Sequence, residues 1–501
     1  MMKIKFFTRV PSWMHNNIIA VLINGVFLLG ALQTSAQHSN FFISNGKDIN
    51  VEKFNNKIQY LMDSIGIPGA SLSIIENNKI VYSHTYGYKN FNDKIKADSN
   101  TMFEACSLSK TYLVYVTYML WEKGLIDLNK PMYQYLGNSR LAHDLRYQLI
   151  TPLMILQHTS GIENWQEDNN KEILEIIEEP GKKFNYSGEG FEYLAKVISE
   201  ILKEPYENYV KRMVFNPLNL KHTQVKFDST ALNTNFSYGH NLFGNHNEKW
   251  ISAIPSPASS IHTTSDEYAK FLISFFNKKY LSDRSVKEML KIKEKIYSNA
   301  EAEYFISNGL FTLKNANDQL VNFSGSNTGF KADMLYSVKN KRGYILFTNS
   351  ELGIMLSPEV NKLSTQLGAN VWFDNIEFKN LAFLNYLTIT YRKPDKDQLL
   401  NEIGRIMKDN SSFDPEVFEY FLSRLMKSDK TTAAQVADVL NRNKQDWPYI
   451  LYVLGVTEDE LNHNYAKALT YFKAAKSLKY TSGNIDGYIN SCEKKLLVSK
   501  E

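Results

Sequence analysis

This sequence of 501 residues contains few cysteines and has a small net charge. Its two cysteines, Cys106 and Cys492, lie in what we predict to be different domains, which argues against a disulfide scaffold. The formal net charge of +4 is small for this length and gives no support for binding nucleic acid or an anionic membrane. The ten histidines are not paired with Cys or carboxylates at metal-ligand spacing, and glycine-rich phosphate loops are lacking. The sequence therefore implies no metal, no cofactor and no nucleic-acid partner.

A mostly apolar run near the N-terminus, over 18–32, follows three basic residues. After it comes Thr34-Ser35-Ala36, and this order is typical of a secretory signal that is cleaved after Ala36. Asn24 and Gly25 interrupt the run, which leaves it short for a permanent membrane span. We therefore predict a signal peptide over 1–36 and an exported protein, periplasmic or extracellular. An uncleaved N-terminal anchor is the alternative.

The remaining chain is long enough for two or three domains, and 43% hydrophobic residues can bury a large core. Over 45–375 the pattern predicts a helix at 51–65 and a hairpin of strands at 70–75 and 80–88. A mainly helical insert follows, over about 125–260. Strands return at 310–313, 319–324, 332–337 and 343–349, with a turn over 325–329. We expect an α+β fold, an α/β sandwich, whose mixed, mainly antiparallel sheet joins distant parts of the chain and is flanked by helices.

Further helices are predicted from capping residues and apolar spacing. Inside 45–375 they lie at 153–157, 190–202, 205–214, 265–277 and 358–373. The segment 380–501 reads as an all-α domain with helices at 395–409, 414–427, 431–443, 446–456, 464–477 and 484–498. Around Leu454 to Ala475 it approximates one tetratricopeptide unit. A helical cap packed on the preceding domain and a peptide-binding surface explain this segment equally well.

The chemistry centres on Ser107-Leu108-Ser109-Lys110, which an apolar run follows. If a helix begins near Ser107, residues three apart share one face, so that the hydroxyl of Ser107 meets the amine of Lys110. A partly buried lysine can accept the serine proton, which turns a weak nucleophile into an effective one. Cys106 is a neighbour of Ser107 but faces about 100° away on a helix, so we expect it to be a small buried apolar residue.

Five stretches in this order resemble the serine β-lactamase and penicillin-binding protein superfamily, and most of all its class C β-lactamase-like branch of esterases and D-aminoacyl peptidases. The likeness covers about 45–375 and implies a β-lactamase/transpeptidase-like fold. The stretches are Ser107-Leu108-Ser109-Lys110, His158-Thr159-Ser160-Gly161, Tyr186-Ser187-Gly188, the segment 217–223, and Phe323-Ser324-Gly325-Ser326-Asn327-Thr328-Gly329-Phe330.

The resemblance implies a mechanism. Ser107 would attack a carbonyl while Lys110 and Tyr186 share its proton, and Tyr186 would pass a proton to the leaving group. The backbone N–H groups of Ser107 and Ser326 would form the oxyanion hole. Water would then hydrolyse the acyl-enzyme. The same resemblance places substrate-binding positions at Gly188, Phe323, Ser324 and Gly325.

Two positions depart from the family's motifs. Gly188 stands where the family usually has Asn, and Phe323 stands where it has Lys or His. A cation at the second position favours the tyrosinate and binds the carboxylate of β-lactams and D-alanyl peptides, whereas phenylalanine does neither. We therefore expect weak or no β-lactamase activity and a shift towards esters or amides without that carboxylate. Lys331 could restore the charge, but we expect it to be a surface lysine.

The sequence thus favours an exported serine hydrolase, esterase-like or peptidase-like, that acts through an acyl-enzyme on a small-molecule or peptide substrate. The alternative is a catalytically silent hydrolase fold that binds a cell-wall fragment, a peptide or a protein, with the C-terminal helices as the contact surface. We expect loops at 225–262 and 290–310 to form the pocket walls.

Overall fold

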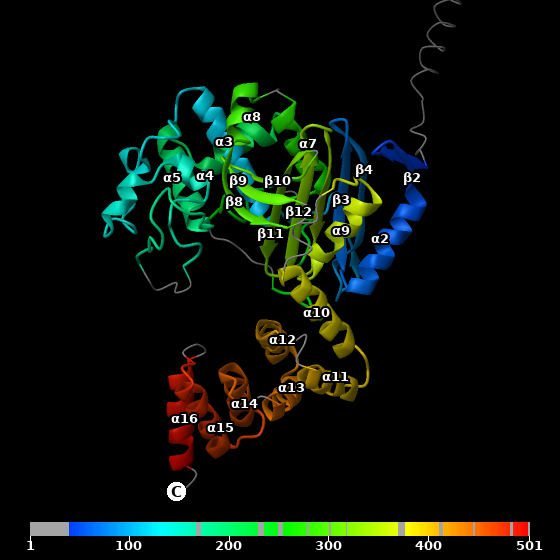
Figure 1. Ribbon diagram of the computed structural model, residues 1–501, viewed down its shortest axis with the longest axis vertical. Coiled ribbons are helices and arrows are strands. Elements are labelled where there is room, and N and C mark those ends of the chain that lie inside the picture. Colours follow the sequence, from blue (N-terminus) through cyan, green and yellow to red (C-terminus); the bar gives the residue numbers. More distant parts are fainter. Residues whose placement is uncertain are drawn as a thin grey trace, which may run out of the picture.

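The computed structural model describes residues 40–166, 172–228, 235–248, 254–277, 280–299, 302–316, 318–368, 376–409, 414–443, 446–480 and 484–498. The predicted signal peptide at 1–36 lies outside these ranges. A sheet covered by helices forms one part of the molecule, and the helices after α10 form a second part below it in Figure 1.

The N-terminal segment folds as predicted around one amphipathic helix. A short hairpin of β1 (Phe41–Ser44) and β2 (Lys47–Asn50) precedes α2 (Val51–Ile65). Phe54, Ile58, Met62 and Ile65 of α2 are buried, at spacings of four and three that keep them on one face. The helix ends at Gly66, whose φ of 86° is the left-handed conformation that glycine adopts at little cost. The predicted hairpin follows as β3 (Gly69–Glu76) and β4 (Lys79–Asn90).

The main sheet has nine strands in the order β5-β4-β3-β13-β12-β11-β10-β9-β8, and each strand runs antiparallel to its neighbours. Its N-terminal strand β3 pairs with β13, which places Leu72 opposite Leu346. The predicted α+β class and the assembly of the sheet from distant parts of the chain are therefore confirmed. The strands not yet given are β5 (Ile95–Lys96), β8 (Ile292–Ser298), β9 (Glu303–Ser307), β10 (Phe311–Lys314), β11 (Gln319–Asn327), β12 (Phe330–Ser337) and β13 (Arg342–Thr348).

Three local predictions were wrong. The segment 290–310, expected as a loop, contains the β8–β9 hairpin. The turn expected over 325–329 is shorter, because pairing with β12 continues to Asn327 opposite Phe330. The closing helix expected over 358–373 is α9 (Ser357–Leu363), which ends at Leu363. The second difference matters most, because it keeps residues 325–327 in strand β11.

The helical layers are built from the middle of the chain. Within them α3 is buried from Lys110 to Leu120, which explains its continuous apolar sequence. A two-stranded sheet of β6 (Phe103–Glu104) and β7 (His262–Thr263) lies beside its start. The elements are η1 (Cys106–Ser109), α3 (Lys110–Glu122), η2 (Met132–Gln134), η3 (Leu145–Leu149), α4 (Pro152–Leu156), α5 (Gly188–Leu202), α6 (Tyr206–Val210), a π-helical turn η4 (Lys211–Phe215), α7 (Ser265–Phe276) and α8 (Asp283–Met289).

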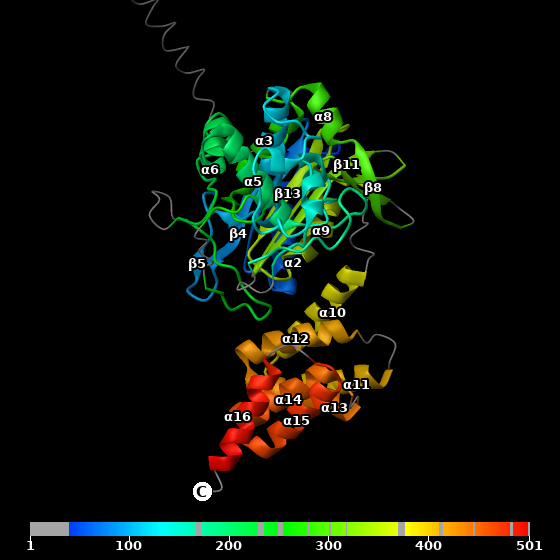
Figure 2. The same ribbon diagram turned by 90° about the vertical axis from the view of Figure 1, so that its left-hand side faces the viewer.

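Side chains that alternate along the strands fix which helix covers which face. On one face, the hydroxyls of Tyr82 and Tyr86 donate to Asn55 of α2. On the other face, Ser71 and Ser73 contact Ser265 at the start of α7. The sheet therefore lies between α2 and α9 on one side and α7 on the other (Figure 1), and Figure 2 shows α2 and α9 from a second direction.

The C-terminal segment is all-helical. The six predicted helices are present, and α10, which the sequence did not reveal, precedes them. Ala468, Phe472 and Cys492 lie in a separate buried cluster of this segment. Within the described ranges, no helix combines the length and apolar character that crossing a membrane requires. The elements of this segment are α10 (Ile376–Tyr391), α11 (Asp397–Asp409), α12 (Pro415–Ser428), α13 (Lys430–Asn443), α14 (Pro448–Glu460), α15 (Tyr465–Ser477) and α16 (Ile485–Val498), and in the sheet domain η5 (Gly353–Leu356) precedes α9.

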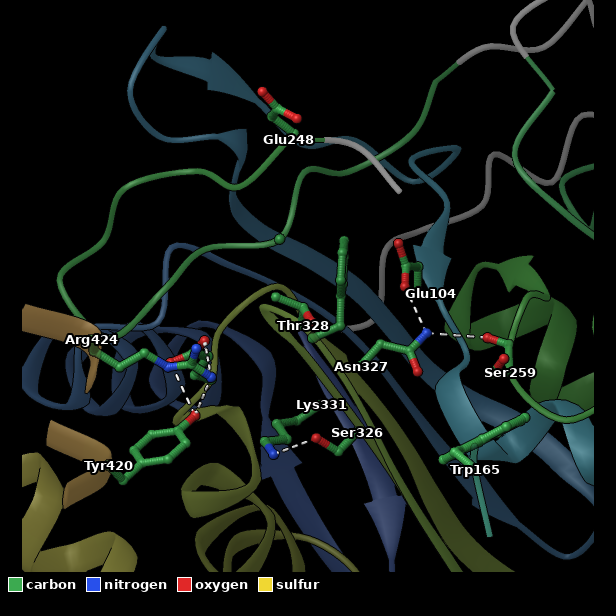
Figure 3. Close-up of a pocket in the computed structure, with 13 residues that line it drawn as sticks. Glu104, Trp165, Glu248, Ser259, Ser326, Asn327, Thr328, Lys331, Tyr420 and Arg424 are labelled. Carbon is green, nitrogen blue, oxygen red and sulfur yellow. Dashed lines mark hydrogen bonds and ion pairs between the residues drawn. The ribbon is translucent and has the colours of Figure 1, made fainter. Parts of the chain in front are cut away.

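Among the described residues, two groups of contacts between the C-terminal helices and the sheet domain stand out. At the first, the rings of Phe243 and Tyr391 lie 4.5 Å apart, and Arg392 donates to the carbonyl oxygen of Leu242 over 2.7 Å. At the second, Arg424 of α12 forms an ion pair of 3.2 Å with Glu351, which lies just after β13. Figure 3 shows this arginine facing the sheet domain.

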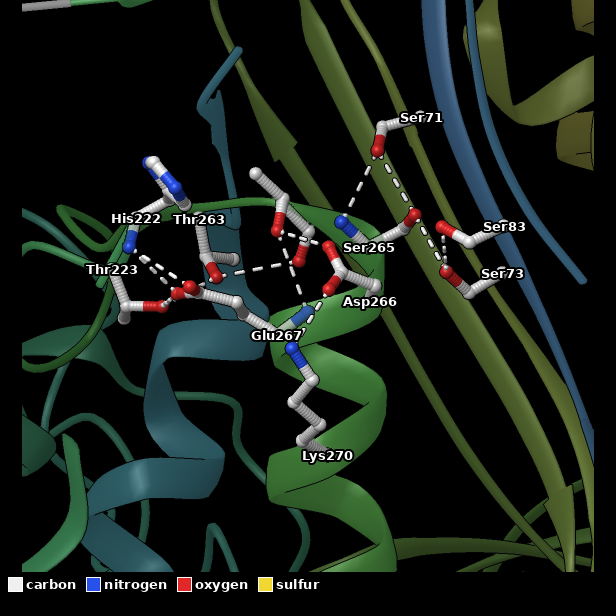
Figure 4. A network of polar contacts seen from close by, with 11 residues as sticks. Ser71, Ser73, Ser83, His222, Thr223, Thr263, Ser265, Asp266, Glu267 and Lys270 are labelled. Atoms are coloured by element: carbon white, nitrogen blue, oxygen red, sulfur yellow. Dashed lines mark hydrogen bonds and ion pairs between the residues drawn. The ribbon is translucent and has the colours of Figure 1, made fainter. Parts of the chain in front are cut away.

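A polar network anchors the N-terminus of α7 (Figure 4). Thr264 accepts a hydrogen bond from the backbone N–H of Glu267, as a helix cap does. The buried carboxylate of Glu267 accepts from the backbone N–H of His222 at 2.9 Å and from the hydroxyl of Thr223 at 2.7 Å. One side chain therefore ties the loop at 222–223 to the helix that covers the sheet.

We expect Glu267→Ala to lower the free energy of unfolding by about 2–4 kcal/mol, because two donors in a water-poor site lose their acceptor. Urea unfolding followed by circular dichroism measures the change. The matched control is Lys270→Ala, which removes a solvent-exposed ion pair with Asp266 and costs less than about 0.5 kcal/mol. Equal losses for both variants would contradict the structural role of Glu267.

Candidate active site

Ser107 lies in η1, a 3₁₀ turn that leads directly into α3. A 3₁₀ turn has three residues per turn, so side chains at positions i and i+3 lie one above the other. Lys110 Nζ is 3.3 Å from Ser107 Oγ and donates to the carbonyl oxygen of Ala258 over 2.9 Å. Lys110 is fully buried, whereas Ser107 is partly exposed. The predicted contact between hydroxyl and amine is therefore confirmed.

Tyr186 approaches the same hydroxyl from the loop that enters α5. Its phenol donates to Ser107 Oγ over 2.9 Å, and Lys110 Nζ lies 4.9 Å from the centre of its ring. The predicted convergence of a hydroxyl, an amine and a phenol is present in the structure.

His158 supports Tyr186 from behind. The two rings stack, with centres 4.2 Å apart and planes inclined by 18°. The backbone N–H of Ser187 donates to His158 Nδ1 over 3.1 Å. Burial, and then the charge of Lys110, hold the pKa of His158 well below its usual range. His158 is therefore a neutral platform that orients Tyr186, a role the sequence did not reveal.

Strand β11 passes very close to η1. Its pairing with β10 ends at Asn322, so the following residues present their edge to the nucleophile. A Cβ atom at Gly325 would lie 2.7 Å from both the backbone nitrogen of Ser107 and Cys106 Cβ. Only glycine allows this approach, which carries the next residue, Ser326, to the mouth of the site.

The hydroxyl of Ser324, a predicted substrate-binding residue, donates to the buried carboxylate of Asp333 over 2.7 Å. Tyr344 also donates to Asp333, over 2.6 Å. Burial raises the pKa of Asp333, and these hydrogen bonds oppose the rise. The hydroxyl of Ser324 thus helps to stabilise a buried acid in the sheet.

Gly188 makes room for an aromatic ring. A Cβ atom there would lie 2.3 Å from the ring of Trp165, which lines the pocket. The backbone N–H of Gly188 donates to Asn164 over 2.9 Å. Trp165 therefore occupies the space next to the position where the resembled family carries its Asn side chain.

Phe323 is buried, and its ring meets Phe311 edge to face at 5.1 Å. Phe311 also stacks at 5.8 Å on His158. At the position where the family's motif has Lys or His, this chain therefore has a phenylalanine that belongs to the aromatic cluster packed against Tyr186.

Lys331, expected to be a surface lysine, is partly exposed and has a defined hydrogen-bond partner. Lys331 lies directly opposite Ser326 in the antiparallel pair of β11 and β12, so both side chains extend from the same face. Its Nζ donates to Ser326 Oγ over 2.6 Å, and it lines the same pocket as Ser326.

The pocket measures about 520 Å³ and opens next to Ser326 (Figure 3). The predicted wall at 225–262 contributes to it, whereas 290–310 supplies none of its lining residues. The C-terminal helix α12 supplies two, which the sequence did not suggest. The lining residues are Glu104, Trp165, Gly239, Glu248, Ser259, Ser326, Asn327, Thr328, Phe330, Lys331, Glu351, Tyr420 and Arg424.

Cys106 is fully buried, as predicted, and adopts a φ of 50° that is rare for residues other than glycine. Cys106 and Cys492 are not joined in a disulfide. Among the residues that the structure describes, no three His, Cys, Asp or Glu side chains gather closely enough to hold a metal ion.

Comparisons with known proteins identify a family for more than half of the chain. The family model Beta-lactamase matches residues 54–367. Protein flp of Staphylococcus aureus (strain COL) is 25% identical over 310 residues, which cover 56% of this chain and 60% of that protein. The chain thus matches less than two thirds of that relative's length.

Two solved structures show the fold. A class C beta-lactamase has a TM-score of 0.53 at 18% identity and covers 64% of this chain and 96% of its own. The D-amino acid amidase from Ochrobactrum anthropi SV3 has a TM-score of 0.51 at 20% identity and covers 62% of this chain and 98% of its own. These likenesses confirm the predicted β-lactamase/transpeptidase-like fold.

We expect Gly325→Ala to slow the modification of Ser107 by a fluorophosphonate about 100-fold, because the added methyl group forces β11 away from the N–H of Ser107. Mass spectrometry of the labelled protein measures the rate. Gly137→Ala is the matched control, since a Cβ atom there meets no atom within 4 Å. An unchanged rate for Gly325→Ala would show that the close approach is unimportant for reactivity.

Proposed function

The chain belongs to the beta-lactamase family of serine hydrolases, and on that premise we propose that it hydrolyses an ester or amide through an acyl-enzyme on Ser107. The observation that carries the proposal is the double contact of Ser107 Oγ, with Lys110 Nζ at 3.3 Å and with the phenol of Tyr186 at 2.9 Å. Two groups that can exchange protons thus contact one hydroxyl, on a residue that is partly exposed.

In the proposed reaction, Ser107 Oγ attacks the substrate carbonyl and its proton passes to the pair formed by Lys110 and Tyr186. Tyr186 then returns a proton to the leaving group, and water releases the acyl group from Ser107. The backbone N–H groups of Ser107 and Ser326 stabilise the oxyanion. The close passage of β11 at Gly325 supports this last assignment, because it brings the two backbone segments together.

The substrate follows from the two motif departures. Phe323 lies in an aromatic cluster, and Trp165 covers Gly188, so apolar rings surround Tyr186 where the family pattern has polar groups. We infer an esterase or amidase with weak or no β-lactamase activity. A D-amino acid amidase with a similar fold supports amide chemistry on this framework.

The location and partners belong to the same proposal. The signal-like sequence over 1–36 supports export to the periplasm or the cell exterior. The tetratricopeptide-like C-terminal helices would be the surface for any protein partner.

The second candidate is a binding protein without catalytic activity. The favouring observation is that Trp165 fills the space at Gly188 and Phe323 is apolar, so two family contacts to substrate and to Tyr186 are replaced. Such a protein would hold a cell-wall fragment or a peptide in the pocket without turnover.

We expect a fluorophosphonate probe to label Ser107 in the wild type, and Ser107→Ala to abolish both labelling and hydrolysis of p-nitrophenyl esters. Tyr186→Phe should reduce the hydrolysis rate about 100- to 10,000-fold, because proton transfer to the leaving group is lost. Nitrocefin and D-alanyl peptides tested in the same screen should be poor substrates.

The matched control is Cys106→Ala, which changes the neighbouring buried residue and should leave labelling at Ser107. A correctly folded wild type that stays unlabelled and hydrolyses none of these compounds would favour the binding protein instead.

A further inference from the structure

A carboxylate that the proposed reaction does not use lies near the candidate base. Glu192 of α5 follows Phe191, whose ring is 5.6 Å from Lys110 Nζ. The side chain of Glu192 is partly buried and accepts a hydrogen bond from the hydroxyl of Ser256. Burial raises the pKa of Glu192, while this hydrogen bond and then the charge of Lys110 oppose the rise. Because removing a carboxylate from water is costly, the hydrogen bond from Ser256 is a main compensation for its position.

Ser256 begins a turn, over 256–260, that leads towards β7. Its Oγ donates to Glu192 and accepts two hydrogen bonds from within the turn. One comes from the backbone N–H of Ala258 over 3.3 Å, and the other comes from the hydroxyl of Ser259 over 3.0 Å. A single hydroxyl therefore connects the carboxylate of α5 to the middle of the turn.

The same turn contacts both parts of the candidate catalytic machinery. The carbonyl oxygen of Ala258 accepts from Lys110 Nζ over 2.9 Å. The carbonyl oxygen of the next residue, Ser259, accepts from the side chain of Asn327 over 3.1 Å (Figure 3). Asn327 follows Ser326 at the end of β11. The turn thus holds the amine of the candidate base and lies against the strand that carries the proposed oxyanion N–H.

We propose that Glu192 is a positioning residue for the candidate base Lys110. Through its hydrogen bond with Ser256, it fixes the turn over which the base is held. The carbonyl oxygen of Ala258, in that turn, then keeps the amine beside Ser107 Oγ. This inference rests on the proposed hydrolase function. The working group of Glu192 is its acceptor oxygen, and it acts on the reaction only through the turn.

The test measures fluorophosphonate labelling of Ser107 in the full-length protein at increasing probe concentrations. This series separates the maximal labelling rate from the half-saturating concentration. We expect Glu192→Leu, which has a similar size but no acceptor, to lower the maximal rate about tenfold, because a misplaced base slows proton transfer and not probe binding. Glu192→Gln keeps an acceptor oxygen for Ser256 and should restore the rate to within about threefold of the wild type.

Ser256→Ala removes the other half of the same hydrogen bond and should lower the maximal rate by a similar factor. Because both residues act through one contact, the double variant with Glu192→Leu should be no slower than the slower single variant. Thermal unfolding is measured for each variant in parallel. Ser256 is partly exposed and loses only a hydroxyl, so Ser256→Ala carries the test if Glu192→Leu does not fold.

The matched control is Glu200→Leu. Glu200 lies about 12 Å further along the axis of the same helix, where it pairs with Lys203 at the surface. The same substitution there should leave both the maximal labelling rate and the half-saturating concentration at their wild-type values.

Two failures are distinguishable. The positioning role is wrong, while the hydrolase function stands, if Ser107 is labelled and Glu192→Leu keeps the wild-type rate or changes only the half-saturating concentration. Equal losses in Glu192→Gln or Glu200→Leu, or additive losses in the double variant, contradict it as well. If Ser107 is not labelled in the folded wild type, the hydrolase function itself fails.

Discussion

The close approach of β11 to the 3₁₀ turn η1 is the constraint on which the candidate site depends. Two segments separated by more than two hundred residues meet at Gly325, where a single Cβ atom would already lie 2.7 Å from the nitrogen of Ser107. Because the nine-stranded sheet fixes β11 between β10 and β12, the position of this edge is set by the whole sheet and not by a local loop. The geometry around Ser107 is thus a consequence of the fold.

The burial of Lys110 follows from the same arrangement. An amine removed from water is costly unless polar groups surround it, and here the carbonyl oxygen of Ala258 and the hydroxyl of Ser107 contact it. The faces of Tyr186 and Phe191 lie 4.9 and 5.6 Å away and add a weaker attraction for its positive charge. The neutral His158 stacks on Tyr186 without adding a second charge. The structure therefore holds an ionisable amine at the serine, with aromatic rings on several sides of it.

The sequence predicted those elements and site contacts whose determinants lie within one turn of each other. The spacing of Ser107 and Lys110, the caps at Thr151 and Thr264, and the glycine after α2 each act within one turn, and the elements they predict are present. The direction of Lys331 was not predictable, because it depends on the register of β12 against β11, which a sequence pattern does not fix. The roles of Trp165 and Arg424 were not predictable either, because each residue reaches the pocket only through tertiary packing.

The register also explains how the chain can differ from its family's motif at Phe323. Phe323 and Ser326 lie three positions apart on one strand and therefore point to opposite faces, so Lys331, opposite Ser326, approaches from the face that does not carry Phe323. On the first face the aromatic cluster packs behind Tyr186; on the second, Glu351 and α12 surround the lysine. A cation at the original position would have to be buried among Phe311 and His158 without a carboxylate in contact, which the cost of burying charge disfavours. On the second face, Lys331 and, from the additional helical domain, Arg424 both lie near the carboxylate of Glu351. Their positive charges are therefore partly compensated there.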